Sequence, residues 1–526
     1  MASGIEVGGY TFPEKTFLGH PRGLFVLFFA EMWERFSYYG MRALLVFYLT
    51  QHWLFSDEKS SVIYGAYTAL FFITPVVGGY LADRWLGQRK AVQFGAVLLT
   101  FGHLLMAVES SLALFWLALA FIIVGGGFLK ANISVIVGQL YERTDPRRDS
   151  AYTVFYVGIN MGAFLGAIVA GWLGQSWGWS WGFGAAGVGM LLGLLVFVWG
   201  RPSLVGKGEA PDPARLDRRT AGIRFETLLY ATGIVSVGLI WWLIQRQALV
   251  GSLLAIAGAA LVGYVVLTAV VKLPAEDRDR IFAALFLIFA SIIFWALYEQ
   301  AGSSLNLYTD RNVDRLILGY EVPAAIFQSV NSFYIFVFGP PLALLWTWLG
   351  RRGVEPSAGA KFGIALLQLG FSFFVLVWGA RMAGIGHLTP VLFIFLIYLF
   401  QTTGELCLSP VGLSAMNRLS PANMASLMMG MWFFANSAGN FAAGLIAAAT
   451  GAKGVETAGQ ERVLEVYSTV GWVGIAVGVV MLLIAPLIGR LMHLSTLGDA
   501  DHSLSGQGAI GEPAAAGMDL RGEVRG

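Results

Sequence analysis

Long apolar stretches follow one another along most of this chain, separated by short polar segments. Each stretch has roughly 18 residues or more, which is enough for an α-helix to cross the hydrocarbon core of a bilayer. The pattern predicts fourteen such helices, near residues 24–51, 62–83, 91–108, 112–140, 150–173, 180–200, 226–246, 249–271, 281–302, 324–349, 357–380, 388–416, 424–449 and 466–492. We therefore expect an all-α polytopic membrane protein.

Two short segments occur twice and suggest an internal duplication. Trp85–Arg89, after the second expected helix, resembles Trp348–Arg352, and Trp33–Arg35 resembles Tyr298–Gln300. The members of both pairs are separated by nearly the same number of residues. A duplication explains this agreement better than chance does, and repeated halves place a substrate site near the bilayer midplane where they meet.

The duplication divides the chain into two six-helix bundles. We predict an N-terminal bundle over residues 1–200 and a C-terminal bundle over 281–493. The segment 201–280 between them is expected to be a linker that carries two inserted membrane helices. The Gly- and Ala-rich tail, 494–526, is expected to be disordered.

One apolar stretch, 24–51, carries four charges. Its polar residues Glu31, Glu34, Arg35, Tyr38 and Arg42 follow one another at helical spacing, so they share one face. Each charge at the centre of a membrane helix costs ~2.5–3.5 kcal/mol, so four cost roughly 12 kcal/mol. Such a stripe is expected to face a bundle interior or a water-filled cavity; the structural alternative is an ion-pair network that only fixes helix packing.

The other intramembrane charges are distributed unequally between the halves. The first half adds Lys130, whereas the second half adds only the carboxylates of Glu299 and Glu405. This distribution predicts bridges across the halves, Arg42–Glu299 and Lys130–Glu405. Because a nearby cation lowers the pKa of a buried carboxyl group, making or breaking a bridge would change proton affinity. A cavity with opposite charges on its walls also suits a zwitterion.

Neutral polar and aromatic residues complete the expected site. They are Asn160, Trp295, Asn331, Trp432 and Asn436, each within an apolar stretch. Asn160 has a structural alternative, a hydrogen bond between packed helices.

Composition and charge narrow the possible functions. The chain has 526 residues, 57% hydrophobic and 13% charged, and its net charge of +2 gives no reason to expect nucleic acid as a partner. A single cysteine, Cys407, excludes an intrachain disulfide and a cysteine metal cluster. Without a nucleophile triad, phosphate loop or metal-ligand cluster, we expect neither an enzyme nor a cofactor. Basic residues in the short loops favour both termini in the cytoplasm.

Several motifs match a known family. Glu31-x-x-Glu34-Arg35-Phe-Ser-Tyr38-Tyr39-Gly40-Met-Arg42 resembles the helix 1 signature of the proton-dependent oligopeptide transporters, the POT/PTR family of the major facilitator superfamily. Phe155–Gly162 resembles the helix 5 signature, and Trp295–Gln300 and Gly404–Pro410 resemble the helix 7 and helix 10 sites. Gly78–Arg89 is similar to the helix 2–3 loop of the superfamily, and the inserted pair fits bacterial members.

The resemblance implies a function and roles for residues. It implies a major facilitator fold and a monomer in the bacterial inner membrane that imports di- and tripeptides with protons by alternating access, driven by the proton gradient. Arg35 and Lys130 would bind the peptide carboxylate, and Glu405, Asn160 and Asn331 the amino group. Glu31, Glu34 and Arg35 would couple protons together with Glu299, the partner of Arg42. Tyr38, Trp295 and Trp432 would shape side-chain pockets, and Arg42, Glu299 and Asn436 would complete the substrate site.

The sequence also departs from the family. Phe72 stands where the helix 2 tyrosine is expected, so one peptide contact would be missing unless Tyr64 or Tyr67 replaces it. The helix 2 histidine of animal members is absent, which leaves coupling to carboxylates. The alternatives are a proton-coupled relative that carries nitrate, an amino acid or a drug, and a passive channel or non-transporting sensor.

Overall fold

The computed structural model describes residues 4–494 apart from 8–9, 14–15, 143–144, 146, 221, 422–423 and 452–455. The described part is almost entirely helical, and it contains all fourteen expected long helices. The predicted disordered tail lies outside the described residues, except for its first residue.

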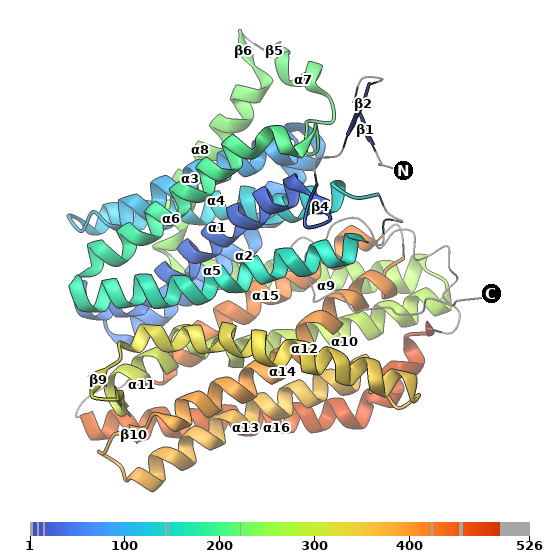
Figure 1. Cartoon of the computed structure of the whole chain (residues 1–526). Helices are drawn as coiled ribbons and strands as arrows, with labels where there is room; N and C mark the ends of the chain where they lie inside the picture. Colours follow the sequence, from blue (N-terminus) through green and yellow to red (C-terminus); the bar gives the residue numbers. More distant parts are fainter. Residues whose placement is uncertain are drawn as a thin grey trace.

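The first half contains six long helices (Figure 1). They are α1 (Arg22–Phe47), α2 (Asp57–Leu81), α3 (Gln88–Met106), α4 (Leu112–Gln139), α5 (Arg147–Trp177) and α6 (Trp179–Gly200). Five-residue π-helical segments extend α1 and α2: η1 (Tyr48–His52) and η2 (Ala82–Leu86). Two short antiparallel pairs precede α1, β1 (Gly4–Val7) with β2 (Tyr10–Pro13) and β3 (Thr16–Phe17) with β4 (His20–Pro21).

The linker is more structured than its polar sequence suggests. It contains η3 (Arg201–Leu204), α7 (Pro213–Asp217) and a hairpin of β5 (Arg219–Thr220) and β6 (Ile223–Arg224). The inserted helices α8 (Phe225–Ile244) and α9 (Gln247–Lys272) follow directly. In Figure 1, α7 and the hairpin extend beyond the end of α8.

The second half also contains six long helices. They are α10 (Ala275–Tyr298), α12 (Ser329–Arg351), α13 (Ala358–Ala383), α14 (Leu392–Leu419), α15 (Ala425–Ala449) and α16 (Glu456–Leu491). Shorter elements are η4 (Glu299–Gly302), α11 (Ser304–Asn312) and η5 (Ala324–Gln328). β7 (Val313–Asp314) pairs in parallel with β10 (Thr389–Pro390), and β8 (Leu316–Ile317) pairs with β9 (Tyr320–Glu321).

The prediction of one uninterrupted helix over 281–302 is wrong. The helix begins earlier, at Ala275, and α-helical geometry ends at Tyr298, where η4 leads into α11. Glu276 and Asp277 in the first turn suit the positive N-terminal end of a helix, which explains the early start. The break permits a close approach, because a Cβ on Gly302 would lie 1.8 Å from the Tyr64 hydroxyl.

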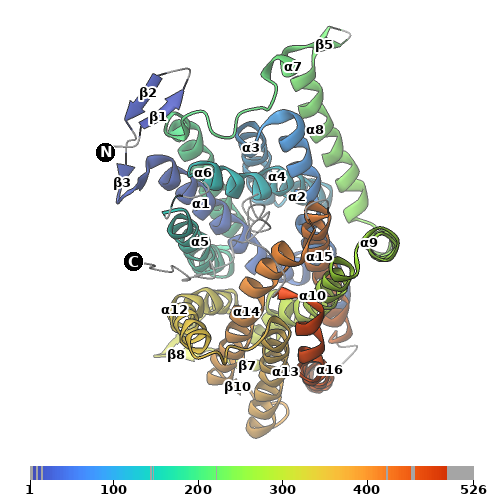
Figure 2. The same ribbon diagram turned by 90° about the vertical axis from the view of Figure 1, so that its right-hand side faces the viewer.

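Each half has its own hydrophobic core, and the inserted pair contacts both. Four buried residues of α8, Leu229, Val237, Ile240 and Ile244, belong to the core of the first half. Near the other end of the pair, Val265 and Ala269 of α9 belong to the core of the second half. The end-on view of Figure 2 shows α8 and α9 along one side of the two helix groups.

Eleven described helices are long and apolar enough to span a membrane. The long helices outside that set are α1, α3 and α15. For α1 the physical reason is its four charges, whose residues are buried within the protein at 1–6% exposure. The chain therefore follows the rule that intramembrane charges face the protein interior rather than lipid.

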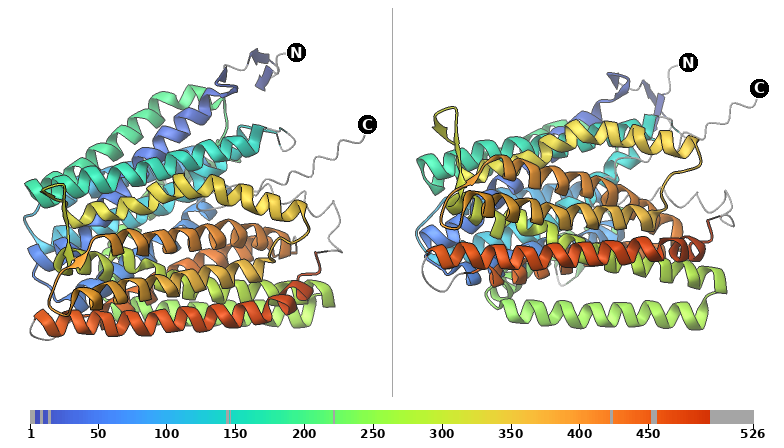
Figure 3. Two further views of the ribbon diagram at one scale, coloured as in Figure 1. Left: turned by 60° about the horizontal axis from the view of Figure 1, so that its bottom comes forward. Right: turned by 90° about the horizontal axis from the view of Figure 1, so that it is seen from below.

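We define the terminus side as the end of the molecule where α1 begins and α16 ends. Figure 3 shows the long helices running between this side and the opposite one, with the two halves tilted relative to each other. Four sets of contacts between the halves lie on the opposite side. Gln51 Nε2 donates to Asp310 (3.1 Å), Arg311 donates to Asp57 (2.5 and 2.9 Å), Trp172 Nε1 donates to Tyr320 (2.9 Å), and the Ala325 amide donates to Gln175 (2.9 Å). These contacts close the opposite side.

The α1–α5 contact is close enough to require glycine. A Cβ on Gly162 of α5 would lie 2.1 Å from the Met32 carbonyl oxygen and 2.9 Å from Arg35 Cβ. Gly162→Val should therefore destabilise the protein by about 1–3 kcal/mol through overpacking. The measurement is thermal unfolding of the purified protein, and the matched control is Gly238→Val in α8, where a Cβ meets nothing within 4 Å. Equal melting temperatures for the two variants would contradict the packing argument.

Candidate functional site

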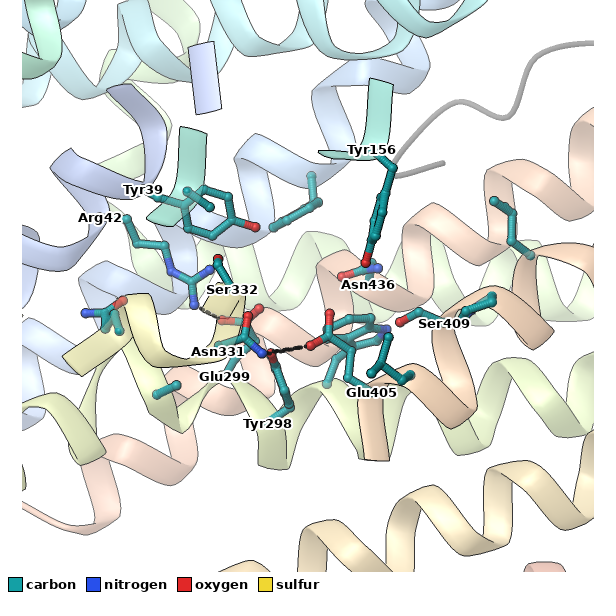
Figure 4. A pocket seen from close by; sticks show the side chains of 18 of the residues that line it. Tyr39, Arg42, Tyr156, Tyr298, Glu299, Asn331, Ser332, Glu405, Ser409 and Asn436 are labelled. Carbon is teal, nitrogen blue, oxygen red and sulfur yellow. Dashed lines mark hydrogen bonds and ion pairs between the residues drawn. The ribbon is translucent and has the colours of Figure 1, made fainter. Parts of the chain in front are cut away.

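A cavity lies between the two halves, and Figure 4 shows side chains that line it. Its space, including the opening to solvent, is about 1270 Å³. The lining residues are Tyr39, Arg42, Phe72, Lys130, Tyr156, Ala163, Ala167, Trp295, Tyr298, Glu299, Ala301, Gln328, Asn331, Ser332, Tyr398, Glu405, Leu406, Ser409, Pro410, Leu413, Trp432, Phe433 and Asn436. Eight of the residues expected from the sequence are among them: Arg42, Lys130, Trp295, Glu299, Asn331, Glu405, Trp432 and Asn436.

The Arg42–Glu299 ion pair joins the halves at one end of the cavity. The guanidinium of Arg42 on α1 pairs with the Glu299 carboxylate, and its Nε donates to the Tyr64 hydroxyl. Both charged residues are buried. The prediction of this bridge is confirmed, and the break after α10 is what presents Glu299 to α1 at the end of a helix.

Glu405 on α14 is held by two donors from other helices. The Tyr298 hydroxyl donates to Glu405 Oε2 at 2.6 Å, and Asn331 Nδ2 donates to the same oxygen at 3.0 Å. Asn331 Nδ2 also lies 2.7 Å from the Tyr298 hydroxyl and 3.0 Å from Thr402 Oγ1. Figure 4 shows these side chains converging on one wall of the cavity. The network fixes the orientation of a buried carboxylate that faces the cavity.

Lys130 contributes a positive charge from α4. Its Nζ lies 3.9 Å from the centroid of the Phe72 ring, within cation–π range. Phe72 therefore lines the cavity where the family motif led us to expect tyrosine. The suggested replacements do not line it: Tyr64 contacts Arg42, and buried Tyr67 packs beside Phe71 with ring centroids 6.1 Å apart. The predicted Lys130–Glu405 bridge stays a prediction, although both residues line one cavity.

Glu31, Glu34 and Arg35 form a buried cluster behind the cavity wall. Arg35 Nε lies 3.1 Å from Glu31 Oε1 and also pairs with Glu34. Tyr38 lies between this cluster and the wall, because the Arg35 guanidinium lies 5.3 Å from its ring and the ring stacks at 4.4 Å on Phe71, which lies 5.7 Å from the Nζ of the lining residue Lys130. These four residues of the expected site are thus adjacent to the cavity but do not line it.

Asn160 also lies outside the lining in this conformation. Its Nδ2 donates to the backbone oxygen of Tyr156 on the same helix, at 3.0 Å. Tyr156, one turn earlier, does line the cavity, and Figure 4 shows it pointing toward Asn436. Within the helix 5 motif, Tyr156 rather than Asn160 therefore faces the cavity in this conformation.

Sequence reasoning missed several polar lining residues. They are Tyr39, Tyr156, Tyr298, Gln328, Ser332, Tyr398 and Ser409. The sequence contained a signal for four of them, because Tyr39, Tyr156, Tyr298 and Ser409 lie inside the family motifs. Gln328 ends η5 and Ser332 lies in the first turn of α12. Helical spacing alone does not predict that this junction lines the cavity.

The cavity extends toward the terminus side. Arg42 and Glu299 lie at its end near the closed opposite side. Tyr156, Leu413 and Trp432, in contrast, lie within three turns of the terminus-side ends of α5, α14 and α15. A ligand held between these ends would thus exchange with the terminus side.

Comparisons with known proteins agree with this arrangement. The family model described as "POT family" matches residues 89–464. The "Uncharacterized transporter YclF" of Bacillus subtilis (strain 168) is 37% identical over 490 residues, covering 91% of this chain and 96% of that protein. The "Peptide transporter YePEPT" of Yersinia enterocolitica is 36% identical over 457 residues, covering 82% and 88%.

Solved structures of peptide transporters are also similar to this chain. A crystal structure of a peptide transporter POT in complex with alafosfalin has 36% identity and a TM-score of 0.81, and covers 91% of this chain and 98% of that one. A crystal structure of a peptide transporter POT in complex with sulfate also has 36% identity and a TM-score of 0.81, with 91% of this chain and 97% of that one covered. The fold expected from the sequence, two six-helix bundles with two inserted helices, is confirmed.

The buried Arg42–Glu299 pair leads to a stability prediction. Arg42→Gln or Glu299→Gln alone leaves an unpaired buried charge, which should destabilise the protein by ~3–5 kcal/mol. The double variant removes both charges and should lose much less than the sum of the two losses. Thermal unfolding of the four purified proteins measures the coupling.

The control for that experiment is the half-exposed Arg311–Asp57 pair on the opposite side. Arg311→Gln should change stability by only ~0–1 kcal/mol, since surface ion pairs contribute little. Additive effects of Arg42→Gln and Glu299→Gln would contradict the bridge.

Proposed function

The chain belongs to the POT family, and on that premise we propose that it imports di- and tripeptides with protons across the bacterial inner membrane. The observation that carries the proposal is the cavity, which has the fixed Glu405 carboxylate on one wall and the Lys130 ammonium on another. A short peptide carries opposite charges at its two ends and suits such a cavity. Relatives named peptide transporters support the substrate class.

The peptide amino group would bind at Glu405 and Asn331. A carboxylate fixed by Tyr298 and Asn331 is preorganised for a cationic donor, so binding needs little side-chain ordering. The peptide carboxylate would bind Lys130, and Arg35 would reach it only after leaving its buried carboxylate partners. Trp295 and Trp432, which line the cavity, would contact the peptide side chains.

Proton coupling would use the buried carboxylates of α1 and η4. Protonation of Glu31 or Glu34 removes a charge that holds Arg35, and protonation of Glu299 removes the charge that holds Arg42. The second event would weaken the contact between the halves at the closed side. Rocking of the two bundles would then alternate access to the cavity.

The orientation follows from the same proposal. With both termini in the cytoplasm, the closed opposite side faces away from the cytoplasm, and the structure is an inward-facing state. No cofactor beyond the proton gradient and no covalent chemistry are part of this mechanism, and a monomer contains the complete cavity. An anion transporter for nitrate is less well supported, because it would have no use for the carboxylate site at Glu405.

Transport into vesicles tests the proposal directly. Proteoliposomes with an imposed inward proton gradient should accumulate labelled dialanine, and unlabelled di- and tripeptides should compete. Free amino acids and nitrate should compete far less. Peptide flux that does not depend on the proton gradient would indicate a passive channel. Inhibition by nitrate but not by peptides would indicate a nitrate transporter.

Glu34→Gln should separate coupling from binding. Without this ionisable group, pH-driven accumulation of dialanine should be lost, while exchange of labelled for unlabelled peptide across the membrane should continue. The measurement compares the two assays in one vesicle preparation. The control is Glu461→Gln, an exposed carboxylate on α16 that should behave as wild type. Retained uphill uptake in Glu34→Gln would refute the coupling role.

Lys130→Ala should weaken binding selectively. Peptides with a free carboxyl terminus should lose about 1.5–3 kcal/mol of binding, the range for a charge-assisted hydrogen bond, whereas C-terminally amidated peptides should lose much less. Calorimetry with purified protein measures both. Lys272→Ala, at the exposed end of α9, is the control. Equal losses for the two kinds of peptide would show that Lys130 does not contact the carboxylate.

A further inference from the structure

A cluster of arginines and aromatic rings lies on the terminus side, away from the cavity, where η2, α7 and the start of α8 meet. We call it the Trp85 cluster; its members are Tyr80, Arg84, Trp85, Arg215 and Phe225. The Trp85 ring centroid lies 5.7 Å from the Arg84 guanidinium and 6.0 Å from that of Arg215. Arg84 also lies 6.0 Å from the Tyr80 ring, and Arg215 lies 5.7 Å from the Phe225 ring.

The carboxylates around this cluster interact with other groups. Glu209 pairs with Arg89 (2.7 Å), Glu226 with Lys90 (2.7 Å) and Asp217 with Arg224 (3.9 Å). Asp83 accepts a hydrogen bond from the Gln88 amide (2.7 Å), and Asp212 accepts one from the backbone N–H of Arg215 (3.0 Å).

The two arginines of the cluster, in contrast, pair with no carboxylate in the part of the chain that the structure describes. Among the described residues, no ion pair or side-chain hydrogen bond involves the guanidinium of Arg84 or Arg215. The buried indole N–H of Trp85 likewise has no acceptor in the described part of the chain. One indole N–H and two guanidinium groups therefore lie together with no carboxylate from the described residues bound to them.

The position of the cluster indicates the source of that anion. It lies at the terminus-side ends of α2 and α8, two helices that are apolar enough to span the membrane. Tyr80 is 55% exposed, and on α8 the apolar residues Ile234, Val235 and Leu239 are 49%, 72% and 60% exposed. An apolar surface thus runs from the cluster along α8 toward the bilayer interior, and exposed Arg218 and Arg219 add positive charge beside it. Figure 1 shows α7 and the hairpin at this end of α8.

We infer that the Trp85 cluster binds the headgroup of an anionic phospholipid. The phosphate would accept hydrogen bonds from Arg84 and Arg215, and the acyl chains would lie against the exposed apolar face of α8. Guanidinium groups bind phosphate through paired N–H donors, and aromatic side chains favour the headgroup level of the membrane. A soluble phosphate would use the same donors but would gain nothing from the apolar surface of α8.

Such a lipid would also hold the linker in place. Arg215 belongs to α7 in the linker, whereas Arg84 belongs to η2 of the first half. A phosphate bound by both arginines would fasten the linker to that half, next to the Arg89–Glu209 pair and the 2.8 Å hydrogen bond from the Arg89 amide to the Gly208 oxygen.

Lipid binding to the purified full chain tests this inference. Delipidated protein in a neutral detergent is titrated with phosphatidylglycerol or phosphatidylcholine, and bound lipid is counted by native mass spectrometry. Wild type should prefer phosphatidylglycerol. Arg84→Gln/Arg215→Gln should weaken its binding roughly 30-fold at low ionic strength, corresponding to ~1 kcal/mol for each arginine near a membrane surface. The matched control, Arg246→Gln/Arg381→Gln, removes two arginines outside the cluster and should keep the wild-type preference.

Three results would overturn the inference. They are unchanged phosphatidylglycerol affinity in the double variant, equal losses in the control, and full displacement of the lipid by millimolar inorganic phosphate, which would indicate a site for a soluble anion. Elution volume and dialanine affinity show whether the double variant is folded. If it is not, the single variants Arg84→Gln and Arg215→Gln carry the test, each with an expected loss of roughly fivefold.

Discussion

The cost of a charge in hydrocarbon is the constraint on which this structure depends. α1 carries four charges inside an apolar helix, and no lipid-facing position could hold them. Glu31 and Glu34 both pair with Arg35 within α1, so this group carries one excess negative charge when both carboxylates are ionised, whereas Arg42 takes its partner, Glu299, from the other half. The ion pairs of the first group lie within one bundle, but the pair of Arg42 can exist only while the two bundles touch. Contact between the halves is thus linked to the charge state of one carboxylate.

The backbone around Glu299 is consistent with the need to pair Glu299 with Arg42 across the halves. α-Helical geometry gives way to a 3₁₀ turn at Glu299–Gly302, and a Cβ on Gly302 at the end of this turn would lie 1.8 Å from the Tyr64 hydroxyl. Tyr64 in turn accepts a hydrogen bond from Arg42, so one helix break serves both members of the ion pair. Close approach also joins the halves elsewhere on the closed side, where a Cβ on Gly65 of α2 would lie 2.7 Å from Gly444 Cα of α15.

Much of this could be predicted from the sequence, because hydrophobic length and intramembrane charge are strong signals. The fourteen helices and the Arg42–Glu299 pair follow from these two. The break after Tyr298 could not be predicted, since Glu299–Gly302 is compatible with a helix and the contact of Gly302 with Tyr64 joins segments far apart in the sequence. The orientation of the Asn160 side chain could not be predicted either. An amide can donate its hydrogen bond within its own helix, and Asn160 does so to the Tyr156 carbonyl. Tyr298 was overlooked because its hydroxyl becomes important only beside Glu405, more than a hundred residues away.

The inserted helices can be understood through the two cores. If the halves rock against each other, a segment attached to both must either bend or move with one of them. One face of α8 packs against the core of the first half, and ion pairs Arg89–Glu209 and Lys90–Glu226 attach the linker and the start of α8 to that half. α9 contacts the second half along much of its length: a Cβ on Gly251 would lie 2.6 Å from the Phe441 ring and one on Gly258 would lie 2.8 Å from the Phe434 ring, while Val265 and Ala269 belong to the second core. The inserted pair is therefore attached to both halves, to the first mainly through α8 and to the second through α9, so relative motion of the halves would have to be accommodated within the pair.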